Sequence, residues 1–312
     1  MKNPPAVLII TYQRVEKFSH ILDQCIKFGI KKIYIAIDDS SITNPELTKA
    51  YETTIAKHDL RSDVKISLWI RETNLGLGVS IITAIDWFFK TEDSGIILED
   101  DLEFTKSSFE FLQKSLEFFR SNKSIFMISG SQFFKNIGPM NGISLGNYPL
   151  VWGWATWKSR WDNFRSAIDN PLEIFPKTNI PIRVKYFWYE GFHRSLLGKT
   201  NSWAVLLATY VRFNNLYCIY PNQNLISNTG FENFATHTKK EKWPLGLPVS
   251  NNFDVDLNSI LLPELNRQLE RDLYRIRFIH ILFFFSCRKN RKFIESKGTP
   301  YLVKKIRDVK AP

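Results

Sequence analysis

The sequence predicts an α/β fold in which a mostly parallel sheet is covered by helices, and three observations lead to this expectation. In the first half of the chain, short apolar runs rich in β-branched residues alternate with stretches of helical spacing, the usual pattern of such sheets. The 312 residues, 44% of them hydrophobic, are enough to bury a large core. A charged fraction of 23% and evenly spread aromatic residues argue against long disordered segments.

Five apolar runs in this part of the chain are predicted to be strands. They cover residues 6–11, 32–39, 64–71, 95–101 and 124–130. Helices are expected between them, at residues 14–28, from about Asn44 onward, at 77–90 and at 107–120. Because these elements alternate, the strands are expected to run parallel, with their carboxyl ends at one edge of the sheet.

Beyond Gly130 the alternation gives way to Gly, Pro, Asn and aromatic residues, which predict loops and short helices over the carboxyl edge of the sheet. Ligands bind at that edge in open α/β sheets. Later helices are expected at 158–164, 182–197 and 203–213, and an edge strand at 216–221.

The net charge of +11 is concentrated at the end of the chain. From Arg271 onward there are 12 Lys and Arg against 3 Asp and Glu, whereas the preceding part holds 30 against 28. A basic tail suits an anionic membrane surface or a nucleic acid, but the body lacks the basic stripe of a nucleic-acid-binding protein. We therefore expect no nucleic acid among the partners.

Three cysteines without metal-site spacing, Cys25, Cys218 and Cys287, are expected to be structural thiols in a reducing cytoplasm. The apolar run near the N-terminus is too short for a signal peptide, and no run approaches the roughly 18 apolar residues of a membrane span. The chain is therefore expected in the cytoplasm.

The predicted strand at 95–101 ends in three consecutive carboxylates, Glu99, Asp100 and Asp101. Like charges this close cost free energy unless a cation neutralises them, and hard divalent ions prefer oxygen ligands. We therefore expect Mn²⁺ or Mg²⁺, which clamps the phosphates of a nucleoside diphosphate and offsets the charge of that leaving group. The alternative is a solvated acidic turn that caps the following helix.

Polar residues also follow the three earlier strands, and they are suited to a nucleoside. They are Thr11 and Arg14, then Asp38, then Asn74 and Gly76. Since parallel strands end at one edge of the sheet, these groups are expected to share a site with the acidic triplet. Taken singly, each is also an ordinary turn or loop residue.

Six segments between Ala6 and His237 resemble the GT-A glycosyltransferases, in particular the N-acetylglucosaminyltransferase I type and its bacterial relatives. They are "LIITYQR", "DDSS", "RETNLGLG", "ILEDDLEF", "WGWATW" and "NLISNTGFENFATHT". The resemblance implies a Rossmann-like GT-A mixed sheet flanked by helices. It also implies an acidic triplet that holds the metal mainly through its last Asp, and a nucleotide held at the first three strand ends.

By this resemblance Asp101 is the metal ligand, Glu99 and Asp100 contact the sugar or ribose, and Arg14, Asp38 and Asn74 contact the donor. His237 is similar to the late histidine that completes the metal or diphosphate site, although a lone histidine is more often structural. Residues 1–261 then form the glycosyltransferase domain. Its nucleotide-sugar-binding half is 1–130 and its acceptor-binding half is 131–261, and a basic helical tail follows at 262–312.

The segment Trp152-Gly153-Trp154 pairs flat aromatic faces with a glycine that lets the backbone approach a ligand closely. Sugars present apolar C–H faces that stack on such rings, so we expect this segment to bind the acceptor. The alternative is packing in the core, where most aromatic side chains lie.

One feature departs from the resemblance. Inverting relatives place a carboxylate after a Trp in the segment that corresponds to "NSWAVLL", where it takes the proton of the acceptor hydroxyl. Here Trp203 is followed by Ala204, so another carboxylate serves or the mechanism differs. Glu190 and Asp162 are the candidate bases, because an aromatic environment raises a carboxyl pKa towards a useful value.

The sequence therefore predicts a metal-dependent, inverting glycosyltransferase that moves a sugar from a nucleotide-sugar donor to a glycan or lipid-linked acceptor of the cell surface. One rival is a sugar nucleotidyltransferase, but such enzymes carry a glycine-rich loop after the first strand, where this chain has Thr11-Tyr12-Gln13-Arg14. The other rival is a non-catalytic nucleotide-sugar-binding protein at a membrane surface.

The tail is expected to anchor the protein peripherally at the cytoplasmic face of a membrane. Residues 277–285, "RFIHILFFF", are too short to span a bilayer and are flanked by Lys and Arg. The alternative is a helix packed on the catalytic domain, because helices that are apolar all round are usually buried.

Overall fold

The structure is a computed structural model that describes residues 4–38, 44–59, 63–133, 139–174, 180–230, 249–261 and 279–312. Strands and helices alternate at first, as β1 (Ala6–Thr11), α1 (Val15–Lys27), β2 (Lys32–Ile37), α2 (Pro45–Asp59), β3 (Lys65–Ile70), α3 (Leu77–Phe88) and β4 (Ser94–Glu99). They are followed by β5 (Leu102–Phe104), α4 (Lys106–Phe118), β6 (Ile125–Ser129), β7 (Ile143–Gly146), β8 (Trp154–Trp157) and α5 (Lys158–Asp169). The rest comprises α6 (Ile182–Leu196), α7 (Trp203–Phe213), β9 (Tyr217–Pro221), β10 (Ile226–Asn228), β11 (Ile260–Leu261), α9 (Ile279–Lys297) and α10 (Tyr301–Asp308).

The described strands form a nine-stranded sheet in the order β11-β7-β9-β6-β8-β4-β1-β2-β3, and β5 pairs with β10 separately. Strand β1 lies parallel to both β2 and β4, with Leu8 opposite Tyr34 on one side and Ile97 on the other. Strand β8 lies antiparallel between β4 and β6, which makes the sheet mixed. The expected α/β fold with a Rossmann-like mixed sheet is confirmed.

The strand at β9 was expected at an edge of the sheet, and that expectation is wrong. Strand β9 lies between β6 and β7, parallel to the first and antiparallel to the second. The pairing partner β7 comes from a Gly- and Asn-rich stretch that gives no strand signal in the sequence. The burial pattern of β9 agrees with an inner position, because its last four residues are buried.

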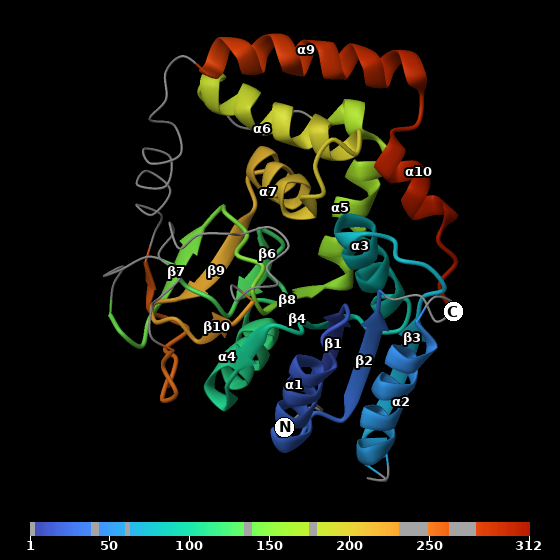
Figure 1. Ribbon diagram of the computed structural model, residues 1–312. Coiled ribbons are helices and arrows are strands. Elements are labelled where there is room, and N and C mark those ends of the chain that lie inside the picture. The colour runs from blue at the N-terminus through green and yellow to red at the C-terminus, as the bar shows by residue number, and fades with distance from the viewer. Residues whose placement is uncertain are drawn as a thin grey trace.

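The core occupies both faces of the sheet, because alternate residues of each strand point to opposite sides. In β1, Leu8 and Ile10 pack with residues of α3 and α7, while Val7 and Ile9 pack with residues of α1 and α4. Every residue of β1 is buried, as expected for a strand covered by helices on both faces. Figure 1 shows these helices around the sheet.

The described part of the tail packs on the rest of the molecule. Helix α9 contacts α6, and α10 contacts α3 and α6 (Figure 1). Cys287, Ile294, Leu302 and Ile306 are buried in the same core as the sheet residues Leu8 and Ile97. This agrees with the alternative of a helix packed on the domain, and the expected boundary at residue 262 lies outside the described residues.

None of the helices in the described part of the chain combines the length and apolar character needed to cross a membrane.

Candidate functional site

A cavity of about 430 Å³ opens at the carboxyl ends of β1, β2 and β4. Most of the residues predicted to bind the donor or metal line it, namely Thr11, Arg14, Asp38, Asn74, Gly76, Glu99, Asp100 and Asp101. Trp152 lies at the same cavity. The convergence follows from the parallel alignment of β1 with β2 and β4, which brings their carboxyl ends to one edge.

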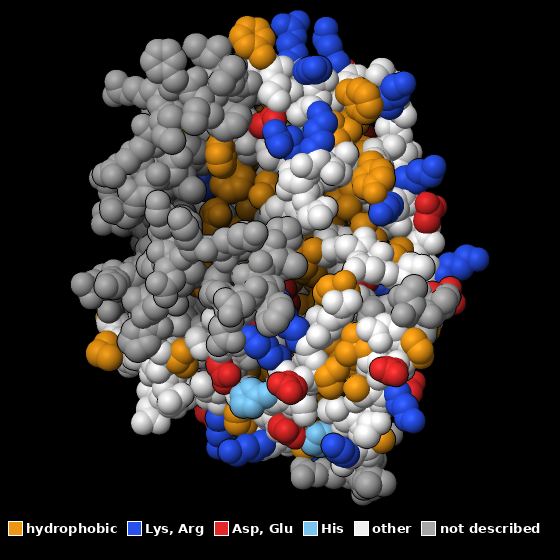
Figure 2. All heavy atoms as spheres, viewed as in Figure 1, with side chains coloured by type: hydrophobic (Ala, Val, Ile, Leu, Met, Phe, Trp, Pro, Cys, Tyr) orange, Lys and Arg blue, Asp and Glu red, His pale blue; other side chains and the backbone are white. Residues whose placement is uncertain are grey.

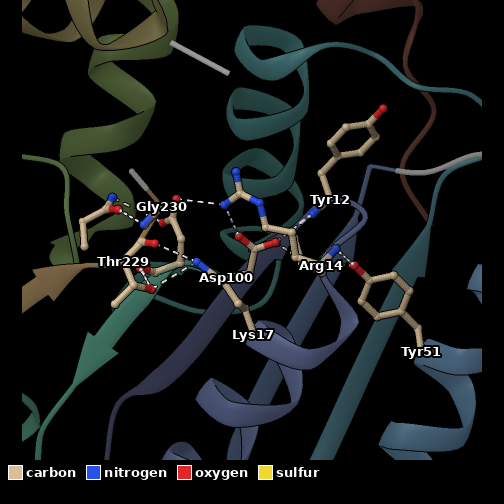
Figure 3. A network of polar contacts seen from close by, with 10 residues as sticks. Tyr12, Arg14, Lys17, Tyr51, Asp100, Thr229 and Gly230 are labelled. Atoms are coloured by element: carbon tan, nitrogen blue, oxygen red, sulfur yellow. Dashed lines mark hydrogen bonds and ion pairs between the residues drawn. The ribbon is translucent and has the colours of Figure 1, made fainter. Parts of the chain in front are cut away.

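Asp100 is held by three donors from the β1–α1 connection (Figure 3). The Thr11 hydroxyl and the Tyr12 backbone N–H donate to Oδ2, at 2.8 and 3.1 Å. Arg14 Nη1 donates to Oδ1 at 3.1 Å. Burial raises the pKa of Asp100 to about 6, and the charge of Asp101 adds to the rise against the lowering effect of Thr11 and Arg14.

Asp101 contacts the same guanidinium and a loop of residues 228–230, which comes much later in the sequence. Arg14 Nη1 lies 2.9 Å from Asp101 Oδ2, so one cation bridges two adjacent carboxylates. The backbone carbonyl of Asp101 accepts a hydrogen bond from the Thr229 N–H at 2.8 Å. Lys17 Nζ donates to the Thr229 carbonyl at 2.7 Å, which ties the loop to α1 (Figure 3).

Gly230 makes the close approach of this loop possible. A Cβ atom at Gly230 would lie 2.2 Å from Asp101 Oδ2, which no side chain tolerates. The Gly230 N–H donates to Asn228 Oδ1 at 2.6 Å, while the Asn228 amide lies 3.4 Å from Asp101 Oδ1. The loop therefore presents amide groups to the acidic triplet and adds no further negative charge.

Glu99 completes the acidic edge of the cavity. Burial and the charges of Asp101 and Asp100 raise the pKa of the half-buried Glu99 carboxyl above its usual range, and Arg14 offsets this in part. Crowded carboxylates of this kind attract a cation. Among the described residues that line the cavity, Arg14 supplies the positive charge.

Asp38 and Asn74 stabilise the β3–α3 connection at the wall of the cavity. Asp38 Oδ1 accepts a hydrogen bond from the Leu75 N–H at 2.9 Å, and burial raises the pKa of this carboxyl. Asn74 Oδ1 accepts from the Gly76 N–H at 2.7 Å. Gly76 has a φ of 77°, a conformation that favours glycine. Both side chains therefore also hold the backbone around the cavity.

The residues around Asp101 include carboxylates that could hold a metal ion. Among the described residues, no three His, Cys, Asp or Glu side chains are arranged as a ready-made metal cluster. Asp100 and Asp101 nevertheless offer the hard oxygen donors that Mg²⁺ and Mn²⁺ prefer, and the Arg14 guanidinium already bridges them. These two carboxylates therefore offer the kind of oxygen ligand that such an ion needs.

Trp152, Gly153 and Trp154 separate in the structure. Trp152 lines the cavity, while Gly153 has a φ of 59° and a Cβ atom there would lie 2.2 Å from the Ile226 side chain. Trp154 is 1% exposed in strand β8 and stacks on Trp203, with ring centroids 6.1 Å apart. The expectation that Trp154 binds an acceptor is therefore corrected, because its ring packs in the core.

The two candidate bases lie away from the cavity. Glu190 is 4% exposed in α6, where it accepts hydrogen bonds from Ser286 Oγ at 2.7 Å and Asn290 Nδ2 at 3.1 Å, both on α9. Asp162 is on the surface of α5, where its carboxylate pairs with Lys158 Nζ at 2.9 Å. Neither lines the cavity, so neither is retained as the base. His237 lies outside the described residues.

Several lining residues were not predicted, among them Tyr12, Ser80, Asn201, Asn228 and Gly230. Asn228 and Gly230 belong to the segment "NLISNTGF", which is part of the resemblance to GT-A glycosyltransferases, so the sequence does contain a signal for them. Asn201 comes just before α7, and nothing local in the sequence connects it with β1 or β4.

No family model and no curated protein sequence matches the chain. Among solved structures, it is similar to HddC from Yersinia pseudotuberculosis, with 12% identity over 50% of this chain and 77% of that chain and a TM-score of 0.31. It is also similar to a UDP-glucose pyrophosphorylase complexed with UDP-glucose, with 12% identity over 70% of this chain and 89% of that chain and a TM-score of 0.38. At these TM-scores the similarity carries no argument about function.

Proposed function

We propose that this chain is a GT-A glycosyltransferase that moves a sugar from a nucleoside-diphosphate sugar to a glycan or lipid-linked acceptor in cell-surface polysaccharide synthesis. The observation that carries the proposal is the convergence of Thr11, Arg14, Asp38, Asn74 and the acidic triplet on one cavity. A volume of about 430 Å³ lies in the range of small-molecule binding sites. The resemblance of the same residues to GT-A motifs supports the assignment to this family.

Different residues of the chain would bind the nucleoside and the diphosphate of the donor. Asp38, which follows β2, and Asn74 would contact the nucleoside. Asp100 and Asp101 would hold the ion, Mn²⁺ or Mg²⁺, which when bound neutralises the charge of the departing diphosphate. Arg14 would donate some of its hydrogen bonds to the phosphate oxygens instead of the carboxylates, since a guanidinium group binds both kinds of oxygen.

Trp152 extends this arrangement towards an acceptor. It is the tryptophan of the predicted acceptor segment that lines the cavity, and it packs edge-on against Phe133 with ring centroids 4.7 Å apart. Because Phe133 fixes its ring, Trp152 is a suitable face for stacking the C–H surface of a sugar. Neither Glu190 nor Asp162 takes part in this proposal, and the inverting outcome rests on the resemblance.

An assay that measures both nucleoside diphosphate and nucleoside triphosphate distinguishes a glycosyltransferase from a sugar nucleotidyltransferase. Purified protein is incubated with individual nucleotide sugars and Mn²⁺, with and without pyrophosphate, and nucleotides are separated by chromatography. We expect release of nucleoside diphosphate, increased by acceptor sugars and abolished by chelation of the metal. Formation of nucleoside triphosphate from pyrophosphate would identify a nucleotidyltransferase instead. Calorimetric binding of nucleoside diphosphate without any release from the sugars would favour a non-catalytic binding protein.

A further inference from the structure

Helix α9 carries two opposite faces. Cys287, Asn290 and Ile294 are buried against the domain. The side chains on the other side are exposed, and we call them the α9 outer face, namely Phe285, Arg288, Lys289, Lys292 and Phe293. At 3.6 residues per turn these five positions fall within an arc of roughly 140°. The outer face is therefore a continuous strip along the helix.

The outer face mixes large apolar and cationic side chains. Phe285 is 63% exposed and Phe293 is 50% exposed. Arg288, Lys289 and Lys292 lie between them, and none of these three cations forms an ion pair with a carboxylate among the described residues. Figure 2 shows Lys and Arg side chains gathered with hydrophobic ones at the top of the molecule, over α9. Helices that lie in a membrane interface combine these two kinds of side chain.

A second cavity, of about 310 Å³, lies between α6 and α9 beside this face. It is lined by Lys185, Tyr186, Tyr189, His193, Cys287, Arg288 and Arg291. The lining contains three cationic side chains and no Asp or Glu. Arg288 belongs to both the cavity and the outer face, so the positive charge continues from the strip into the cavity. The cationic and aromatic lining of this cavity suits a ligand that has a phosphate group next to an apolar group.

We propose that the α9 outer face docks on an anionic lipid bilayer, with Phe285 and Phe293 at the level of the headgroups and Arg288, Lys289 and Lys292 against lipid phosphates. A lipid surface accounts for both kinds of side chain, because the phenyl rings leave water while the cations remain at the phosphate layer. A nucleic acid would account for the charge alone, and the body of the chain, with 30 Lys and Arg against 28 Asp and Glu before Arg271, offers it no continuing basic stripe. This inference is independent of the proposed function, since binding to lipid needs no nucleotide.

The test is co-sedimentation of the full chain with vesicles of phosphatidylcholine alone or mixed with phosphatidylglycerol. We expect binding to the mixed vesicles, released only in part by salt because insertion of phenyl rings is not screened. The double variant Phe285→Ser/Phe293→Ser should bind about tenfold more weakly and be released fully by salt. The variant Lys289→Gln/Lys292→Gln should lose about tenfold of the preference for phosphatidylglycerol.

The matched control is Phe118→Ser/Lys114→Gln, which removes an exposed Phe and an exposed Lys from α4. It should bind the vesicles as the unchanged protein does, and thermal melting shows that each variant folds. Equal binding to both kinds of vesicle, an equal loss in the control, or no loss in either α9 variant would overturn the proposal. So would binding to a DNA oligonucleotide that anionic vesicles fail to displace, or concentration-dependent self-association through this face.

Discussion

Two regions of this molecule each bury a carboxylate, and the charges of the groups around it differ between them. Asp100 is 7% exposed at the cavity, where it accepts hydrogen bonds from Thr11, Tyr12 and Arg14 but also lies next to two further carboxylates, Glu99 and Asp101. Glu190 is 4% exposed between α6 and α9, where its neighbours are the donors Ser286 and Asn290. The burial is similar, and the surroundings differ.

This difference distinguishes a candidate binding site from a structural contact between two helices. At the cavity, carboxylates repel one another and the pKa of Asp100 rises to about 6 through burial and the charge of Asp101. Such an arrangement weakens the folded state unless a ligand relieves it, which is typical of functional sites. At the α6–α9 contact the carboxylate also accepts from two donors, Ser286 and Asn290, but it has no second carboxylate beside it in sequence, so it stabilises the packing of one helix on another. Burial alone therefore does not identify a catalytic carboxylate.

The largest effect that this comparison predicts is at Asp101. Asp101→Asn removes an anionic ligand and relieves repulsion, so we expect metal-dependent binding of nucleoside diphosphate to weaken by about a hundredfold or more, with unfolding free energy equal or higher. Calorimetric titration with Mn²⁺ and urea unfolding measure the two quantities. Asp162→Asn, at an exposed position on α5, is the matched control and should change neither. Unchanged affinity in Asp101→Asn would remove the metal site from the proposal.

At the α6–α9 contact the expectation is reversed. Glu190→Ala leaves Ser286 Oγ and Asn290 Nδ2 without their shared acceptor, so unfolding free energy should fall by about 2–3 kcal/mol. Glu190→Gln keeps an acceptor oxygen and should lose about 1 kcal/mol. Affinity for nucleoside diphosphate should stay the same in both. If Glu190→Gln instead lost turnover at unchanged stability, Glu190 would return as a candidate base.

The same contact should show its own pH dependence through His193. Burial and the charge of Arg291 lower its pKa from 6.5 to about 4, so between these values the unfolded chain binds more protons at this residue than the folded one. Stability from His193 is therefore complete above pH 6.5 and is lost as the pH falls, by about 2 kcal/mol at pH 5. Urea unfolding as a function of pH should show this component missing in His193→Gln.

His20 provides the control, because its side chain is 55% exposed on α1. His20→Gln should retain the loss of stability between pH 6.5 and pH 5 that the unchanged protein shows. Equal slopes for both variants and the unchanged protein would contradict a lowered pKa at His193.

How far the sequence predicts this molecule depends on the range of the contacts involved. Strands β1 to β4 were predicted because their apolar runs and intervening helices are local signals. Strand β8 lies where the sequence predicts loops, because Trp154 and its neighbours become a strand only through pairing with β4 and β6. The strand ends of the site were predicted from the alternation alone. The partners of Glu190 were missed because Ser286 and Asn290 follow it by 96 and 100 residues.

The smallest expected effect concerns Gly230, whose segment resembles a GT-A motif in the sequence but whose contact with Asp101 only the structure shows. A Cβ atom at Gly230 would meet Asp101 Oδ2 at 2.2 Å, so Gly230→Ala must move either the loop or the carboxylate. We expect metal-dependent affinity for nucleoside diphosphate to fall by about tenfold, which is about 1.4 kcal/mol, with stability nearly unchanged because the loop lies at the cavity rather than in the core. Gly78→Ala, in the first turn of α3, is the control, because the nearest neighbour of an added Cβ atom there, at 3.5 Å, is at ordinary contact distance. It should leave the affinity unchanged, since alanine fits there and suits a helix. A Gly230→Ala protein that binds metal and nucleotide normally would mean that Asp101 does not need its present position, and the distinction drawn between the two buried carboxylates would then lose its structural basis at the cavity.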